Sequence, residues 1–238
     1  MMAEVSEKVA IVTGASHGIG AGLAKAYREL GFAVVATALS IEPSEDPRVL
    51  TIAGDITAPE TSERIVAATL ERFGRIDTLI NNAGIYIGKP FTEYTLEDFN
   101  AVLAVNVAGF FHITTRVIKQ MLERGHGHVV NISTTLAEQA DAKVPAALAA
   151  LSKGGLAAVT GSLAIEYASR GLRVNAVSLG VIKTPLNDGS SYASAEALHP
   201  IGRVGEVQDV VGGILYLESA PFVTGEILHI DGGQSAGH

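Results

Sequence analysis

The stretch Val9 to Gly20 reads VAIVTGASHGIG and decides the fold. An apolar run, Val9 to Val12, stops at Thr13-Gly14, and after two further glycines an amphipathic stretch runs from Ile19 to Leu30. This order predicts a buried strand, a tight turn and a helix. The start of a helix presents unpaired N–H groups and the positive end of its dipole, and glycine lets a phosphate approach the backbone closely. The stretch therefore predicts a dinucleotide site at the edge of an open α/β sheet.

Composition limits the classes of protein that fit this chain. Its 238 residues are 47% hydrophobic, enough for one large domain with its own core. The net charge is −8 and no cluster of Lys and Arg is present, which argues against nucleic acid as a partner. The absence of cysteine excludes disulfides and thiolate chemistry, and it suits the cytoplasm. We recognise no signal peptide and no run of ~18 apolar residues, so we expect a cytoplasmic protein without a membrane partner.

Short apolar segments alternate with amphipathic ones along the chain, which is typical of a parallel sheet covered on both faces. The apolar segments predict strands at 9–12, 33–38, 49–53, 78–81, 129–132, 174–178 and 227–230. The other segments predict helices at 19–30, 57–73, 95–124, 146–167 and 206–217. Residues 184–200 are polar and weakly periodic, which favours a mobile flap over the substrate. We expect an α/β chain with a single domain over residues 1–238, a doubly wound Rossmann fold with a seven-stranded parallel sheet.

Helix starts and one interruption can also be predicted. Thr57 and Glu60 have the spacing of a capping box for the second helix, and Thr95 and Asp98 have it for the third. The long third helical segment is expected to be interrupted near Asn106 and Gly109.

Several short motifs follow one another in a fixed order. They are Thr13-Gly14-x-x-x-Gly18-x-Gly20, Gly54-Asp55, Asn81-Asn82-Ala83-Gly84, Asn106, Asn175 to Gly180 with Ile182-x-Thr184, and Asp231-Gly232-Gly233. Together they resemble the short-chain dehydrogenase/reductase family along nearly the whole chain. The resemblance implies hydride transfer between NADP or NAD and a carbonyl or alcohol substrate. It implies cofactor contacts from Gly14, Ser16, His17, Gly18, Ile19, Gly20, Asp55, Ile56, Asn82, Ala83, Gly84, Lys153, Gly180, Ile182 and Thr184.

The residue that donates the proton in this family is missing here. The family places a tyrosine four residues before a lysine, on one helix face, where the ammonium lowers the pKa of the phenol. In this sequence Lys153 is present, but the tyrosine position holds Ala149, and no tyrosine lies between Tyr94 and Tyr167. A positioned general acid contributes ~10²–10⁴ in rate. The resemblance leaves Asn106, Lys153 and a hydroxyl at Thr134 as the catalytic residues.

Three explanations of this altered site stay open. In the first, the chain is an oxidoreductase that takes its proton from water, from the substrate or from another group, for which Asp141 and Lys143 are hypotheses based on location. In the second, it binds the cofactor without turnover and acts as a sensor or an oligomer partner. The third is an engineered tyrosine-to-alanine variant, but Leu179, where the family has proline, favours natural divergence.

Cofactor preference, metals and assembly complete the predictions. An acidic residue ~20 positions past the glycines normally binds the ribose of NAD, but that place holds Ala38 with uncharged neighbours. This favours NADP slightly over NAD, with His17 as the nearest candidate for the extra phosphate. The histidines have no ligand spacing, so we expect no metal. The resemblance implies a tetramer or dimer formed through the helices at 107–124 and 146–167.

Overall fold

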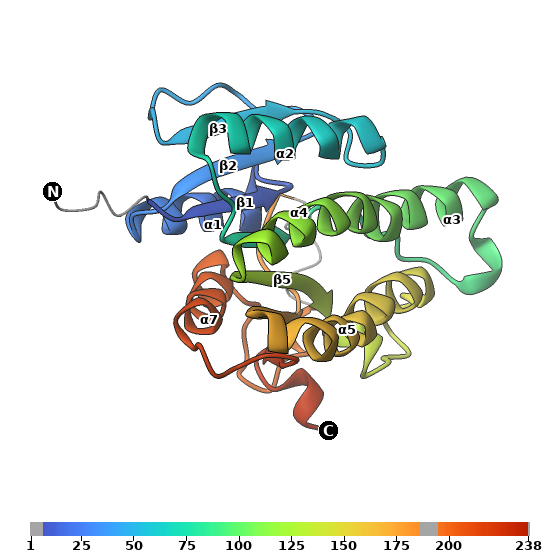
Figure 1. Ribbon diagram of the computed structural model, residues 1–238. Helices are drawn as coiled ribbons and strands as arrows, with labels where there is room; N and C mark the ends of the chain where they lie inside the picture. Colours follow the sequence, from blue (N-terminus) through green and yellow to red (C-terminus); the bar gives the residue numbers. More distant parts are fainter. Residues whose placement is uncertain (1–6, 186–194, 238) are drawn as a thin grey trace, which may run out of the picture.

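The computed structural model describes residues 7–185 and 195–237. Seven parallel strands form one sheet in the order β3-β2-β1-β4-β5-β6-β7 (Figure 1), which confirms the predicted sheet. The strands are β1 (Val9–Thr13), β2 (Ala33–Ala38), β3 (Val49–Ala53), β4 (Thr78–Asn81), β5 (Gly127–Thr134), β6 (Leu172–Leu179) and β7 (Ile227–Ile230). The strand order reverses between β1 and β4, so the carboxyl ends of these strands form the crevice where such folds bind ligands.

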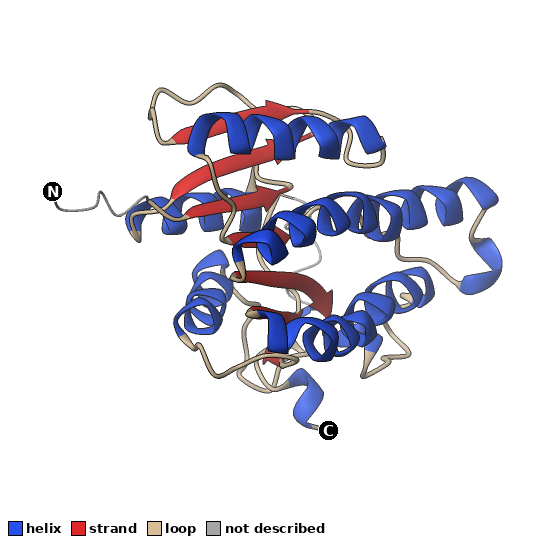
Figure 2. Cartoon of the chain, viewed as in Figure 1, coloured by secondary structure: helices blue, strands red, loops and turns tan. Residues whose placement is uncertain are grey.

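Helices cover both faces of the sheet, as Figure 2 shows. One face carries α1 (Gly18–Glu29) and α7 (Val207–Ser219). The other carries α2 (Pro59–Phe73), α4 (Phe110–Arg124) and α5 (Ala147–Tyr167). Before α4 come α3 (Leu96–Leu103) and a π-helical turn, Ala104–Gly109. Short 3₁₀ turns lie at Phe91–Glu93, Thr135–Ala137, Ala168–Arg170 and Gln234–Ala236. The predicted doubly wound Rossmann fold is confirmed.

The centre of the sheet is apolar because helices cover both sides of it. All five residues of β1 are buried, and so are the first seven of β5. Each aliphatic side chain buried in this way contributes ~1.5–3 kcal/mol. The rigid centre holds the carboxyl ends of β1, β4 and β5 in fixed positions, which is what a ligand site at that edge requires.

The starts of two helices test the capping predictions. Thr95 and Asp98 form the predicted capping box of α3. The predicted box of Thr57 and Glu60 is wrong, because α2 begins with Pro59 in its first turn after Ala58 as the N-cap. The Thr57 N–H instead donates to Asp55 Oδ1 at 2.9 Å, which forms a turn before the helix. The predicted interruption near Asn106 is confirmed as the π-helical turn.

From the sequence we expect no membrane-spanning helix and a flap over residues 184–200. The segments Leu96–Arg124 and Ala147–Arg170 are long and apolar enough to cross a membrane by length and composition alone. Helices of a soluble core pass the same test, and α5 packs on β5 and β6 here. Residues 186–194 of the predicted flap lie outside the described part of the chain.

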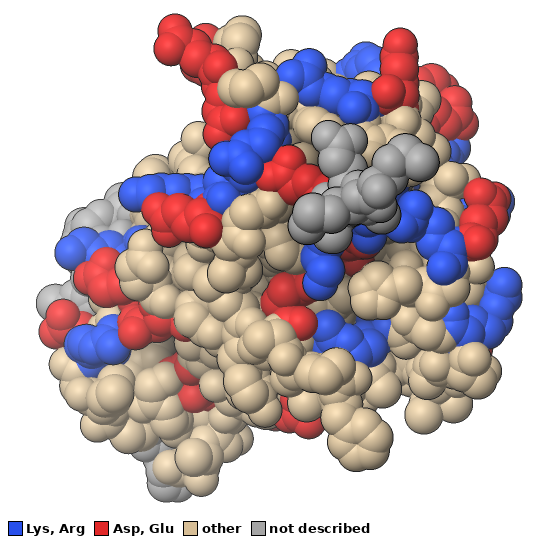
Figure 3. All heavy atoms as spheres, turned by 60° about the vertical axis from the view of Figure 1, so that its left-hand side comes forward, with Lys and Arg blue, Asp and Glu red and all other residues tan. Residues whose placement is uncertain are grey.

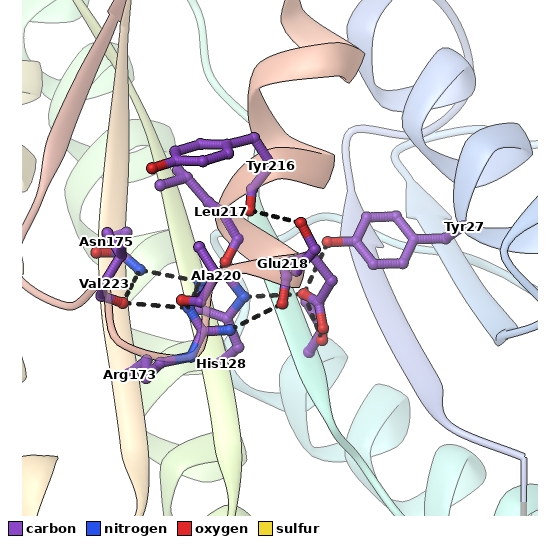
Figure 4. Close-up of polar contacts among 11 residues, drawn as sticks. Tyr27, His128, Arg173, Asn175, Tyr216, Leu217, Glu218, Ala220 and Val223 are labelled. Atoms are coloured by element: carbon purple, nitrogen blue, oxygen red, sulfur yellow. Dashed lines mark hydrogen bonds and ion pairs between the residues drawn. The ribbon is translucent and has the colours of Figure 1, made fainter.

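A polar network holds α1 and α7 to the amino ends of the central strands (Figure 4). Glu218, at the end of α7, accepts hydrogen bonds of 3.1 Å from both Tyr27 and Thr78, and lies 2.8 Å from His128 Nδ1. Arg173 donates to the carbonyl oxygens of Leu217, Ala220 and Val223. The network lies at the end of the sheet opposite the predicted ligand site, so its role is to support the fold.

Charges of both signs are interspersed on the face drawn in Figure 3. Many are paired on the surface. Arg28, for example, lies 3.0 Å from Asp46, and Arg48 lies 3.0 Å from Glu7. The mixture agrees with the modest net charge of the chain. It differs from the continuous basic surface that tracks a nucleic acid backbone.

Candidate active site

The glycine loop between β1 and α1 forms an open cradle at the carboxyl edge of the sheet. Gly14 has a φ of +66°, and a Cβ on it would lie 2.9 Å from Asn82 Nδ2. A Cβ on Gly20 would lie 2.2 Å from the carbonyl oxygen of Gly14. Helix α1 begins at Gly18, so the N–H groups of its first turn face this edge. Only glycines keep the cradle open, and its shape and polarity suit a pyrophosphate. The other predicted loop residues, Ser16, His17 and Ile19, are exposed or half-buried there.

Asn82 fastens the end of β4 to this loop. Its Nδ2 donates to the carbonyl oxygens of Thr13 at 2.9 Å and Gly14 at 3.1 Å. In return, the backbone N–H groups of Asn82 and Ala83 both donate to Thr13 Oγ1 at 3.0 Å. These four hydrogen bonds fix the two walls of the crevice at the point where the strand order reverses.

The adenine side of the predicted site lies after β3. Asp55 is exposed there, and Ile56 packs against Gly109, where an added Cβ would lie 2.9 Å from Ile56 Cγ2. Both residues therefore lie at the same edge as the glycine loop, as predicted.

A cation from α2 lies at the end of the edge strand β3, which the sequence did not reveal. Arg64 Nη2 donates to the carbonyl oxygen of Ala53 at 2.5 Å, and Ala53 pairs with Ala38 in the sheet. The Gly54 N–H in turn donates to Ala38 O at 2.9 Å. Arg64 is therefore a candidate for the extra phosphate that the sequence did not single out, in addition to His17. Adjacency in a sheet, which joins residues far apart in the chain, is not visible in the local pattern.

Asn106 joins three segments inside the molecule. It is 1% exposed, its Oδ1 accepts from the Ile85 N–H at 2.9 Å, and its Nδ2 donates to Ile85 O at 3.0 Å and to Ser152 Oγ at 3.1 Å. The π-helical turn turns this side chain inward, toward the loop after β4 and toward α5. Asn106 thereby fixes the position of that loop relative to α5.

Lys153 reaches the crevice from α5. Its Nζ donates to the carbonyl oxygen of Ile132 at 2.9 Å, near the end of β5. A Cβ on Gly84 would lie 2.8 Å from the same Nζ, so the ammonium lies against the loop that follows β4. Burial of this ammonium lowers the pKa of Lys153 to about 8.

The two remaining catalytic positions differ from each other. Ala149, one turn before Lys153, is 5% exposed. Thr134 lies at the end of β5, where its hydroxyl donates to Leu179 O at 3.4 Å and caps the 3₁₀ turn that follows. Both contacts are long for hydrogen bonds of a hydroxyl, so the hydroxyl is weakly held.

The segment after β6 closes the crevice on its other side. Thr184 carbons lie 3.3 Å from where a Cβ on Gly18 would stand, which brings the segment to the glycine loop. Ile182 forms a bridge with Gly205, and Gly180 lies against His199 Nε2. A cavity of about 240 Å³ lies beside these residues, lined by Gly180, Ile182, His199, Arg203, His229 and Asp231.

Metal ligands were not expected, and the described ranges 7–185 and 195–237 contain no group of three or more His, Cys, Asp or Glu side chains placed to hold a metal ion. Of the two hypothetical proton donors, Asp141 accepts a hydrogen bond from the Lys143 N–H at 2.7 Å, and Lys143 is exposed. Both therefore lie in the loop between β5 and α5, and the contact of Asp141 is made within that loop.

Comparisons with known proteins agree with this geometry. A family described as enoyl-(acyl carrier protein) reductase matches residues 14–235. An oxidoreductase of Methylorubrum extorquens is 36% identical over 98% of this chain and 99% of its own length. Among solved structures, ElxO with NADP bound has a TM-score of 0.90 and 29% identity, covering 97% of this chain and all of that one. A 3-ketoacyl-(acyl-carrier-protein) reductase from Brucella melitensis, complexed with NADH, has a TM-score of 0.89 and 30% identity, over 96% and 98%.

These matches define the class of the protein, an oxidoreductase of doubly wound fold whose structural neighbours have been solved with NADP or NADH bound. The chain belongs to the short-chain dehydrogenase/reductase family. A tyrosine-to-phenylalanine variant of ElxO has been solved with NADPH bound, so one structural neighbour holds its cofactor with a phenol removed.

Proposed function

We propose that this chain reduces a carbonyl compound, or oxidises the corresponding alcohol, with a nicotinamide cofactor and an altered proton-donor site. One observation carries the proposal. The Lys153 ammonium lies against Gly84 and the Ile132 carbonyl oxygen, at the edge where the glycine loop opens. This is a position from which a cation can hold the sugar next to the nicotinamide even though Ala149 stands where the family has tyrosine.

The roles of the other residues follow from their places. Gly14, Gly18 and Gly20 leave room for the pyrophosphate, and Asp55 and Ile56 flank the adenosine. Thr184 lies against Gly18 of the glycine loop, and Gly180, Ile182 and Thr184 border the nicotinamide, while Asn106 positions the loop after β4. When bound, the reduced nicotinamide supplies the hydride. The protein orients the substrate, excludes water and provides the proton.

We further propose NADP as the preferred cofactor. The guanidinium of Arg64 lies at the end of β3, the strand next to β2, and a guanidinium binds phosphate oxygens through two parallel hydrogen bonds. Ala38 and its neighbours Leu39 and Ser40 carry no charge, so they do not repel a 2′-phosphate at the end of β2. Arg64→Ala should reduce the preference for NADPH over NADH about tenfold or more, whereas Arg72→Ala, on the same helix, should leave it unchanged.

The proposal is tested by fluorescence titration of NADPH and NADH, followed by absorbance assays with 3-oxoacyl thioesters, ketones, aldehydes and sugars. Lys153→Met should weaken binding of NADPH by roughly 10- to 100-fold, because a charge-assisted hydrogen bond is lost. Lys119→Met, an exposed position on α4, is the matched control. Failure of the unaltered chain to bind either cofactor would refute the proposal.

A second candidate function is binding without turnover, which Ala149 itself favours. A sensor or an oligomer partner needs the cradle and Lys153 but no proton donor. Tight binding of NADPH, combined with no oxidation of it by any compound of the panel at any pH, would favour this candidate over the first.

Assembly into a dimer or tetramer is also proposed. Several large apolar side chains are exposed on the helices named for this role, namely Val107, Phe111, Leu151 and Ile165, with Ile165 83% exposed. A second copy of the chain covering them would remove this surface from water. Light scattering of the purified chain tests the proposal, and Ile165→Lys should shift the mass toward the monomer.

We propose that residues 1–238 act as one cofactor-binding domain in the cytoplasm, without nucleic acid or membrane as partners. The absence of cysteine and the mixed surface charges support this proposal. Fractionation of cells that produce the chain tests the compartment.

A further inference from the structure

We propose that Tyr86 is the proton donor of this site and replaces, from a different loop, the phenol that is absent at Ala149. The inference rests on the proposed carbonyl reduction and adds a catalytic residue to it. It starts from the loop between β4 and α3, which passes the beginning of α5 in Figure 1.

The backbone on either side of Tyr86 is fixed to the crevice. Gly84 lies against the Lys153 ammonium, and Ile85 is held by Asn106 through two hydrogen bonds, of 2.9 Å and 3.0 Å. The residue just before Tyr86 is therefore held in a fixed position relative to α5. Tyr86 also follows by two residues the glycine that lies against the Lys153 ammonium, although Tyr86 and Lys153 are far apart in the sequence.

The phenol reaches toward the helix that carries Ala149. Tyr86 Oη lies 3.5 Å from the carbonyl oxygen of Pro145, two residues before α5 begins. This contact is at the long limit for a hydrogen bond, so the hydroxyl is weakly engaged and can turn to another acceptor. Tyr86 is 43% exposed, which leaves it accessible to a substrate in the crevice.

The loop is built to accommodate this ring. A Cβ on Gly88 would lie 2.5 Å from Tyr86 Oη and 2.9 Å from two ring carbons, so a larger residue at position 88 would displace the ring. Partial burial also raises the pKa of Tyr86, so its hydroxyl keeps the proton at neutral pH. A donor must be protonated before the reaction, and this phenol is.

The other phenol of the loop, Tyr94, is held by a hydrogen bond within the loop. Tyr94 Oη donates to the carbonyl oxygen of Ile87 at 2.8 Å, and its ring lies edge-on to Phe91 and under Lys89. Tyr94 is therefore a matched control in the same loop. It has the same chemistry as Tyr86 but a short internal hydrogen bond.

The reduction forms one C–H bond and one O–H bond on the substrate. The substrate carbonyl carbon gains the hydride that the reduced nicotinamide supplies, and its π electrons move to the oxygen. Tyr86 Oη–H breaks and its proton forms the new O–H bond of the alcohol. The Tyr86 phenolate then takes a proton from water, which restores the neutral phenol.

Four chains test the assignment: the unaltered protein, Tyr86→Phe, Tyr94→Phe, and Tyr86→Phe with Ala149→Tyr. We expect Tyr86→Phe to lower kcat by ~10²–10⁴ while the Kd for NADPH stays unchanged, and Tyr94→Phe to keep both. The double variant should recover part of the lost rate, because it returns a phenol to the helix face of Lys153.

A second measurement does not depend on turnover. In a complex with oxidised cofactor and the best ketone of the panel, the ketone oxygen should accept a hydrogen bond from Tyr86. We therefore expect a tyrosine ultraviolet difference spectrum in the unaltered chain and in Tyr94→Phe but not in Tyr86→Phe. Full turnover by Tyr86→Phe, or an unchanged difference spectrum, would overturn the assignment while leaving the proposed function intact. Cofactor binding without turnover by the unaltered chain would overturn both.

Discussion

His128 Nδ1 lies 2.8 Å from Glu218 Oε2, and His128 is only 2% exposed (Figure 4). The other ring nitrogen, Nε2, faces the donors Asn175 Nδ2 at 3.1 Å and Arg173 Nη1 at 3.5 Å. Because those groups can only donate, Nε2 must accept and Nδ1 must carry the proton. The network therefore specifies a neutral imidazole beside a charged carboxylate.

This arrangement predicts loss of stability in acid. Burial lowers the pKa of His128 and the contact with Glu218 only partly offsets this, so the unfolded chain binds a proton before the folded one does. Burial raises the pKa of Glu218, but hydrogen bonds from His128, Tyr27 and Thr78 outweigh burial and leave a net lowering. Both shifts have the same sign. The free energy of unfolding should fall as the pH falls below about 6.5, through His128, and fall further below about 4.3, through Glu218.

Urea unfolding of His128→Asn checks this prediction. At neutral pH the variant should be less stable by roughly 1–3 kcal/mol, because buried donors lose their acceptor. Between about pH 7 and pH 5 its stability should change less than that of the unaltered chain. His126→Asn, at an exposed position two residues away, should behave like the unaltered chain. If the free energy of unfolding falls equally with pH in His128→Asn and in His126→Asn, the loss of stability in acid cannot be assigned to His128.

The glycine loop gives a prediction with a control on another helix. A Cβ on Gly20 would lie 2.2 Å from Gly14 O, which is backbone and cannot yield easily. Gly20→Ala should therefore lower stability by ~1–3 kcal/mol and weaken binding of NADPH at least tenfold. A Cβ on Gly155 in α5 meets no described atom within 4 Å. Gly155→Ala should raise stability by up to ~1 kcal/mol through helix propensity and leave binding unchanged. Thermal unfolding and a fluorescence titration measure both effects.

Much of the fold could be predicted because apolar runs mark buried strands. The bounds predicted at 33–38, 49–53, 78–81 and 227–230 are those of β2, β3, β4 and β7. The strands β5 and β6 are longer than predicted, since His128, Arg173 and Ser133 interrupt the apolar pattern. Backbone pairing from Gly127↔Leu172 to Thr134↔Leu179 nevertheless continues through these polar residues.

The predicted site was incomplete for a different reason. Sequence motifs identify residues that belong to a local pattern, such as the glycines of the loop after β1 or Lys153 on α5. Arg64 of α2 reaches Ala53 of β3, and Tyr86 approaches Pro145 from another loop. Such contacts are created by the fold, so no local pattern announces them.

Asn106 should link stability to catalysis. Its buried amide makes three hydrogen bonds, which hold Ile85 and Ser152 together across the crevice. Asn106→Ala leaves the Ile85 N–H and carbonyl unpaired, so stability should fall by roughly 1–3 kcal/mol. Because the loop that carries Gly84 then loses its fixed position, kcat should fall by more than KM rises. Asn100→Ala, at an exposed position on α3, should change neither stability nor kinetics. Chemical denaturation and steady-state kinetics of the two variants provide the comparison.

The lowered pKa of Lys153 predicts how cofactor binding depends on pH. Burial lowers this pKa to about 8 from a value near 10.5, so the ammonium loses its charge within an accessible range. A charged donor forms stronger hydrogen bonds to ribose hydroxyls than a neutral amine does. The Kd for NADPH should therefore rise as the pH passes from about 7 to about 9. Between about pH 8 and pH 10.5 the unfolded chain holds more protons than the folded one, so this group makes the free energy of unfolding rise with pH. Lys153→Arg stays charged throughout and should bind NADPH with a Kd that is flat over this range, and Lys153→Met should bind weakly at every pH. A Kd for the unaltered chain that is independent of pH, measured beside a flat Lys153→Arg, would mean that the ammonium does not contact the cofactor.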